Sequence, residues 1–385
     1  MQFLIYFCIG VSHAAAKQKT LNQQVINIAY LAQQQVPTPA LLLIDSLLKE
    51  QGVLGAELAI IDNNTTGKFT GQQFNLKKII VPVETNLLDV FKSSVLGQFE
   101  FVIADLPAEQ VKQIADMAAT KALLFDVQTT DDAQRNADCR HNVLHILPSR
   151  AMRADALAQY MMKKRWTKWF LLIGKNPEDS LYADAIKRSA KRLNIKLVAE
   201  KKWQHNFDSR GTEEAEIPVF TQVDDYDVLV IADEQGQIGD SLEYRTWKPR
   251  PVIGTQGLVA TAWHPTHEQW GAIQIQNRFR EKAGRWMNER DYAAYLAVRA
   301  IGEAATRVKS NSISAISAFI LSDQFSLQGY KGSPLSFRKW DGQLRQPILL
   351  AAPRSLVAVA PIDGFLHPKT ELDSLGYDQP ESTCQ

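Results

Sequence analysis

The chain has 385 residues, 45% of them hydrophobic, which is enough for two domains that each bury a core of their own. Its 43 basic and 42 acidic side chains leave a formal charge of +1. This balance provides no strongly basic surface, so the composition argues against a nucleic-acid-binding protein and against a protein held on anionic membranes.

An apolar run opens the chain at residues 3–11 and is too short to cross a bilayer as a helix. Ala14 and Ala16 follow at the spacing of a signal-peptidase site, although no Lys or Arg precedes the run. We expect residues 1–16 to be a signal peptide that is removed on export; a buried first strand is the alternative. Removal of Cys8 would leave Cys139 and Cys384, which permits either one disulfide or two separate buried thiols.

The first half of the remaining chain alternates short apolar strands with amphipathic helices, a pattern typical of a parallel sheet covered on both faces. The expected strands cover residues 26–31, 58–61, 101–104 and 122–125, and the expected helices cover residues 37–49 and 107–119. The segment Asp-Asn-Asn-Thr-Thr-Gly follows at residues 62–67. We interpret it as a turn capped by its Asn and Thr side chains, because Gln73 stands where a calcium loop needs Glu.

The pattern restarts after Pro148, where Ser149 is a plausible N-cap for a helix that runs to residue 164. Asn194 is suited to close a second helix in the left-handed conformation. The further elements expected are strands at residues 169–173, 195–199, 227–232, 252–253 and 348–361, and helices at residues 181–193, 270–283 and 289–308. Two similar α/β halves fit this pattern better than a repeat array does.

The chain lacks the motifs of the common enzyme classes. The first strand-to-helix turn, residues 29–39, has no glycine to cradle a pyrophosphate, and no Gly-x-Ser-x-Gly elbow is present. The cluster His264, His267 and Glu268 could ligate a metal, but Pro265 is expected to start a helix there, with Glu268 favouring its dipole. We therefore expect no catalytic residues, no metal and no cofactor.

Polar residues stand at the carboxyl ends of the expected strands, where open parallel sheets bind their ligands. Tyr182, at the start of a helix in the second half, occupies a comparable place. The candidate ligand-binding residues are Asp105, Asp126, Tyr182, Asp233, Thr255 and Gln256. The alternative for each Asp is an ordinary helix N-cap.

The polar C-terminal segment carries a family resemblance. Residues 361–367 and 371–384 interleave turn formers with Phe and Leu, and residues 338–347, 62–67 and 148–150 followed by 155–157 share the likeness. Together they resemble the periplasmic solute-binding proteins of ABC transporters that accompany PQQ-dependent alcohol dehydrogenase systems, which are relatives of the branched-chain amino acid receptors. The motifs are typical of that family, and none of them is catalytic.

The resemblance implies a type I periplasmic binding protein fold, with two doubly wound parallel-sheet lobes joined by a three-strand hinge. It places lobe 1 at residues 17–147 and 257–336, and lobe 2 at residues 148–256 and 337–385. We also predict a disulfide between Cys139 and Cys384, because the periplasm that the resemblance implies is oxidising and these two cysteines would remain after removal of the signal peptide.

Two functions remain from the sequence. The first is a periplasmic, non-enzymatic binding protein that captures a small polar solute between its lobes and delivers it to an inner-membrane ABC permease. It would not span the membrane itself and would bind no nucleic acid. The second is an accessory factor or enzyme of the alcohol-oxidation system that keeps the same fold without transport.

Overall fold

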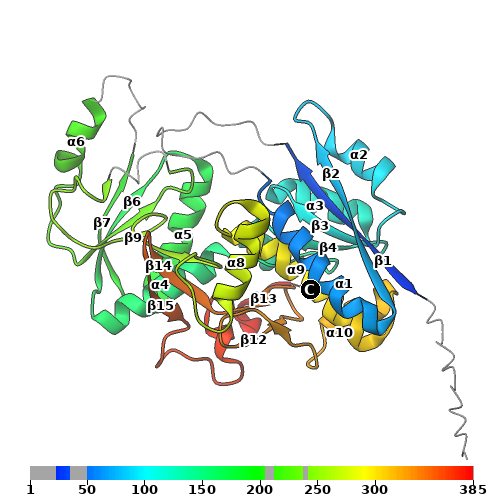
Figure 1. Ribbon diagram of the computed structural model, residues 1–385. Helices are drawn as coiled ribbons and strands as arrows, with labels where there is room; N and C mark the ends of the chain where they lie inside the picture. Colours follow the sequence, from blue (N-terminus) through cyan, green and yellow to red (C-terminus); the bar gives the residue numbers. More distant parts are fainter. Residues whose placement is uncertain (1–22, 35–49, 204–211, 237–241, 385) are drawn as a thin grey trace, which may run out of the picture.

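The computed structural model describes residues 23–34, 50–203, 212–236 and 242–384, and in helix α6 it describes side chains only from residue 216 onward. The expected signal peptide at residues 1–16 and the expected helix at residues 37–49 lie outside the described residues. The described chain forms two lobes, each built on its own sheet (Figure 1).

Lobe 1 is built on a five-stranded parallel sheet whose central strands are buried on both faces. Its spatial order is β2 (Gln72–Val81), β1 (Gln24–Gln33), β3 (Phe101–Asp105), β4 (Leu123–Asp126) and β5 (Val143–His145). The helices around it are α1 (Val53–Thr70), α2 (Leu87–Ser94), α3 (Ala108–Ala118), α8 (Ala272–Ala283), α9 (Glu289–Val308) and α10 (Ile313–Ile320). Alternate residues of β1 enter two separate cores, one with α1 and α9 and the other with α2 and α3. Burial of both faces explains the continuous apolar runs of β3 and β4.

Lobe 2 is built on a seven-stranded mixed sheet. Its spatial order is β15 (Ser355–Ala360), β14 (Ile348–Ala352), β10 (Leu258–Thr261), β9 (Val252–Gly254), β8 (Val228–Ala232), β6 (Lys168–Ile173) and β7 (Lys196–Lys202). The strands from β10 to β7 are parallel, whereas β14 and β15 pair antiparallel. Its helices are α4 (Arg150–Lys164), α5 (Pro177–Arg192) and α6 (Thr212–Phe220). The expected α/β fold with two parallel-sheet lobes is confirmed.

The chain crosses between the lobes at three places that the strand pairings define. The first crossing lies between β5 and α4. The second follows Thr261, because β10 still pairs in the lobe 2 sheet. The third follows the small antiparallel sheet of β11 (Leu327–Gln328), β12 (Pro334–Phe337) and β13 (Leu344–Arg345), whose apolar side chains join the lobe 1 core. The second crossing, after Thr261, and the third, after Arg345, thus lie beyond the expected positions near residues 256 and 336.

One expected strand was wrong. Residues 58–61 lie inside helix α1, and the expected turn at residues 62–67 is its last part. Helix α1 packs along α9, and Gly302 of α9 lies so close to Asn63 that a Cβ on it would be 2.3 Å from the Asn63 side chain. The expected helix start at Pro265 was also wrong, since residues 264–271 form turns and α8 begins at Ala272.

Capping explains where the lobe 2 helices begin. Ser149 caps α4 as expected, accepting a hydrogen bond from the Met152 N–H at 3.3 Å. Helix α5 begins earlier than the expected residue 181, because Asn176 and Asp179 form a capping box. Asn194 has a φ of 55°, which confirms the left-handed end predicted for this helix.

Candidate cleft between the two lobes

A cleft of about 1020 Å³ lies where the carboxyl ends of the two sheets face each other. Lobe 1 contributes the loops after β3 and β4 and the first residues of α9. Lobe 2 contributes the starts of α4 and α5, the loops after β8 and β9, and strand β10. The polar lining residues include Thr129, Thr130, Asp131, Arg150, Arg153, Glu178, Tyr182, Asp233, Glu234, Thr255, Gln256, Thr261, Glu289 and Arg290.

Four of the six candidate ligand residues line this cleft, and all four belong to lobe 2. They are Tyr182, Asp233, Thr255 and Gln256. Asp105 and Asp126, the two candidates of lobe 1, do not belong to the lining. Their strands end at the correct edge of the sheet, but their carboxylates are buried among other groups of lobe 1.

Asp105 is held beneath the cleft by a tyrosine and an arginine. The Tyr30 hydroxyl donates to its Oδ2 at 2.6 Å, and Arg290 Nε lies 3.6 Å from its Oδ1. Burial raises the pKa of Asp105, even though Arg290 and Tyr30 act in the opposite direction. Arg290 itself lines the cleft, so it connects Asp105 to the space where a ligand would lie.

Asp126 is fully buried and organises the loop that follows β4. Its Oδ1 accepts hydrogen bonds from the backbone N–H groups of Gln128 at 3.1 Å and Thr129 at 2.9 Å. Its Oδ2 accepts from the Thr129 hydroxyl and from His145 Nδ1, the latter at 2.7 Å, and Arg135 lies 3.7 Å away. Burial alone would raise the pKa of Asp126, but His145, Arg135 and Thr129 hold it below its usual range.

The lobe 2 candidates support one another. Thr255 Oγ1 accepts from the Asp233 N–H at 2.9 Å and donates to the Ile231 carbonyl at 3.2 Å. The Gln256 amide donates to the Asp233 carbonyl at 3.1 Å. Burial raises the pKa of Tyr182, so its hydroxyl stays protonated and can donate to a ligand.

Two arginine–carboxylate pairs in the cleft were not predicted from the sequence. Arg150 binds Glu234 through two hydrogen bonds of 2.7 Å within lobe 2. Arg153 on α4 pairs with Glu289 of α9 at 3.0 Å and therefore connects the two lobes. The sequence feature that could have indicated Arg150 is its position directly after the N-cap Ser149, because the start of helix α4 lies at the cleft.

Glu289 also accepts two hydrogen bonds from residues at the end of β10. It accepts from the Thr261 hydroxyl at 2.7 Å and from the Ala262 N–H at 3.1 Å. Burial alone would raise the pKa of Glu289, but Arg153, Thr261 and the Ala262 N–H keep it below the usual range. It therefore remains charged and keeps the Arg153 guanidinium in place.

The charges of the cleft are unequal. Its lining holds three arginines and five carboxylates, and each arginine already faces a carboxylate, since Arg290 faces Asp105. An anionic ligand would therefore meet an excess of negative charge in the cleft. The starts of α3, α4, α5 and α9 also line the cleft, and their N-terminal ends favour partial negative charge such as hydroxyl oxygens.

Within the described ranges, no group of three His, Cys, Asp or Glu side chains could hold a metal ion. His264 Nδ1 bonds to Thr266 Oγ1 at 2.7 Å, and His267 Nε2 bonds to the Tyr330 carbonyl at 2.6 Å. Among the same residues, no helix is both long and apolar enough to cross a membrane.

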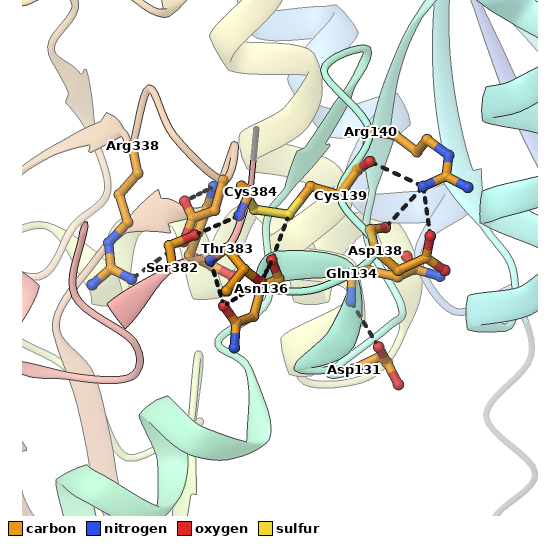
Figure 2. Close-up of a disulfide and its surroundings, with 12 residues drawn as sticks. Asp131, Gln134, Asn136, Asp138, Cys139, Arg140, Arg338, Ser382, Thr383 and Cys384 are labelled. Atoms are coloured by element: carbon orange, nitrogen blue, oxygen red, sulfur yellow. Dashed lines mark hydrogen bonds and ion pairs between the residues drawn. A yellow bond between two sulfur atoms is a disulfide. The ribbon is translucent and has the colours of Figure 1, made fainter. Parts of the chain in front are cut away.

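The disulfide between Cys139 and Cys384 is present, as predicted. The two Cα atoms are 5.6 Å apart, and 245 residues separate the cysteines along the chain. Figure 2 shows the C-terminal residues beside the β4–β5 connection of lobe 1.

Comparison with known proteins identifies the fold. No protein-family model matches the chain, and no curated protein matches it. A branched-chain amino acid ABC transporter periplasmic ligand-binding protein from Burkholderia xenovorans aligns with a TM-score of 0.71 and 14% identity, over 93% of this chain and 99% of that one. The leucine-, isoleucine-, valine-, threonine- and alanine-binding protein of Brucella ovis gives 0.66 and 13%, over 88% and 92%.

A third structure, a solute-binding protein from R. palustris in complex with benzoate, gives a TM-score of 0.64 and 11% identity, over 87% of this chain and 95% of that one. Each of the three alignments covers at least 87% of this chain and at least 92% of the other. The protein therefore has the fold of the type I periplasmic binding proteins, as seen in the solute-binding proteins of ABC transporters.

Proposed function

We propose that the protein is the periplasmic solute-binding component of an ABC transporter and that it captures a small polar ligand between its lobes, without turnover. The observation that carries this proposal is the cleft, which is lined from both lobes and crossed by the Arg153–Glu289 pair. A ligand in such a cleft favours the closed arrangement of the lobes by contacting both. Its partner would be an inner-membrane permease.

We further propose that this transport is linked to PQQ-dependent alcohol oxidation. The support for this link is the sequence likeness at residues 338–347 and in the C-terminal segment. Export by removal of residues 1–16 belongs to the same proposal and is supported by the apolar run and the Ala14–Ala16 spacing. We propose lobe limits after β5, after β10 and after β13, which the pairing of β10 in the lobe 2 sheet and the apolar side chains of the β11–β13 sheet in the lobe 1 core support.

The ligand we propose carries hydroxyl groups or an amine rather than a free carboxylate. The surplus of carboxylates over arginines in the cleft supports this choice, because every arginine of the lining already faces an acid. We propose Tyr182, Asp233, Thr255 and Gln256 as direct contacts. Asp105 and Asp126 would act on the ligand through Arg290 and through the loop that carries Thr129.

A screen with three matched probes tests the ligand chemistry. Ethylene glycol, ethanolamine and glycolate have similar size and differ in carrying a second hydroxyl, an amine or a carboxylate. A bound ligand at a hundred times its dissociation constant stabilises the protein by about 2.7 kcal/mol and raises its melting temperature accordingly. We expect a shift with the diol or the amine and none with the acid; a shift with glycolate alone would contradict the proposed ligand class.

A pair of substitutions tests the site itself. Thr255→Val removes a cleft hydroxyl, whereas Thr246→Val removes a lobe 2 hydroxyl that donates to the Lys248 carbonyl and does not line the cleft. Calorimetry with the probe that binds should show weaker binding in the first variant and unchanged binding in the second. Equal affinity in both would place the ligand elsewhere, and conversion of the bound probe would favour an enzyme.

A further inference from the structure

The C-terminal segment contacts both lobes, and each end of it is attached to a different one. After β15 the chain passes two short 3-10 helices, η2 (Glu371–Ser374) and η3 (Gln379–Glu381), and Cys384 then lies beside lobe 1. We use the term strap for residues 373–384.

The lobe 2 end of the strap is anchored in the core between α4 and α5. Leu375 is fully buried in the lobe 2 core. The Gly376 N–H donates to Asp155 Oδ2 at 2.9 Å, and the Gly376 carbonyl accepts from Arg188 at 2.9 Å and from Arg192 at 3.0 Å. Gly376 has a φ of +80°, and a Cβ on it would be 2.6 Å from Met152 Cγ, so only glycine allows this close approach.

The lobe 1 end of the strap is covalent. Cys384 is joined to Cys139, and Thr383 adds two hydrogen bonds to Asn136, from its N–H at 2.9 Å and from its hydroxyl at 2.8 Å (Figure 2). The loop that carries Asn136 and Cys139 moves with lobe 1, because Arg140 binds Asp116 of α3.

A buried ionic cluster fixes the strap to the last crossing between the lobes. Asp373 accepts hydrogen bonds of 2.8 Å from Arg338, which directly follows β12, and from Arg345, the last residue of β13. Arg338 is 1% exposed and also donates to the Leu375 carbonyl at 2.8 Å. The strap therefore holds the point at which the chain leaves lobe 1 for β14.

Only a short length of free chain joins the lobe 2 attachment of the strap to its attachment on the β4–β5 loop. Arg188 of lobe 2 pairs with Glu381 at 3.1 Å, and the next contact with the β4–β5 loop of lobe 1 is at Thr383, two residues later. Two residues span at most about 7 Å when fully extended. If the exposed Glu381 pair breaks, the free chain reaches back to Tyr377, whose carbonyl accepts from Arg338 at 3.1 Å. Tyr377 is six residues before Thr383, and six residues span at most about 22 Å.

We propose that the strap is a built-in limit on the rotation of the two lobes, with the disulfide as its covalent end. Within the strap, rotation of lobe 2 relative to the β4–β5 loop of lobe 1 must be absorbed between Gly376 and Thr383, since Gly376 is held by α4 and α5 of lobe 2 and Thr383 by Asn136 of lobe 1. This device goes beyond ligand capture and does not depend on which solute is bound.

The test measures the distance between the lobes in the ligand-free protein. Nitroxide labels are attached through keto amino acids at Glu109 of α3 and Asp184 of α5, two exposed positions on opposite lobes. Pulsed electron resonance then gives the distance distribution before and after reduction of the folded protein with a phosphine, with thiol titration to confirm release of both cysteines. We expect a broader distribution after reduction.

Three variants complete the test. Cys384→Ser should broaden the distance distribution as reduction does. Arg188→Ala should also broaden it, because this variant weakens the attachment of the strap to lobe 2 while the disulfide to lobe 1 stays closed. Arg250→Ala removes an exposed lobe 2 ion pair with Asp225 and should leave the distribution unchanged. Circular dichroism confirms that each variant is folded. An unchanged distribution in the reduced protein and in Arg188→Ala would overturn the proposal.

Discussion

The substitution Asp126→Asn distinguishes a structural aspartate from a ligand contact at the end of a strand. In the native protein the carboxylate accepts two backbone hydrogen bonds and faces both His145 and Arg135. The asparagine amide carries no negative charge, so the buried Arg135 loses its charge partner. Its NH₂ group would also face N–H and O–H groups that donate to the native carboxylate. Breaking a buried pair from one side costs about 3–5 kcal/mol.

Urea unfolding followed by far-ultraviolet circular dichroism measures this loss. With a slope of about 3 kcal/mol/M, the midpoint should fall by about 1 M or more. The matched control is Asp131→Asn in the same loop. Asp131 lines the cleft, accepts from the Gln134 N–H at 3.0 Å, and lies 3.9 Å from Arg150. Asn accepts such a bond as well as Asp does, so we expect a loss of about 1 kcal/mol or less. If the two variants lose the same stability, the reasoning about Asp126 is refuted.

Three further predictions follow from single groups. Asp105→Ala should cost about 1–3 kcal/mol in urea unfolding, because the buried Tyr30 hydroxyl loses its shorter hydrogen bond and keeps only the 3.2 Å contact with the Gln51 carbonyl; an unaffected midpoint would contradict this. Gly376→Ala should destabilise the protein by about 2–4 kcal/mol, because the new Cβ meets Met152. The control is Gly97→Ala, which has the same φ but no atom within 4 Å of the new Cβ, and it should cost about 1 kcal/mol. Equal losses in the two variants would argue against the close contact at Gly376. Burial lowers the pKa of His145, so below about pH 6.5 the unfolded chain binds a proton at this ring that the folded protein does not. The free energy of unfolding should therefore fall toward pH 5, and His145→Gln should reduce that fall. An identical pH profile in the variant would show that this ring does not contribute.

Much of the fold could be predicted because parallel sheets leave a strong signal in the sequence. Strands β3, β4 and β8 are buried at every residue, so each is a continuous apolar run ending at an aspartate or just before one. Helix ends were predictable where a local cap decides them, as at Ser149 and Asn194.

The strand expected at residues 58–61 shows the limit of such patterns. A four-residue apolar run fits a strand and a buried helix equally well. Here the choice depends on α9, which lies more than two hundred residues later and packs on Asn63 through Gly302. No local feature of the sequence contains that contact.

The candidate site likewise has features that could be predicted from the sequence and features that could not. The sequence by itself determined that polar residues stand at the strand ends of both lobes, because strand length and chain direction are local properties. Only the tertiary structure decided that Thr255 and Gln256 line the cleft while Asp126 is enclosed by His145 and Arg135. It also decided the Arg153–Glu289 pair between the lobes, since burial and charge pairing depend on which distant segments pack around each strand end.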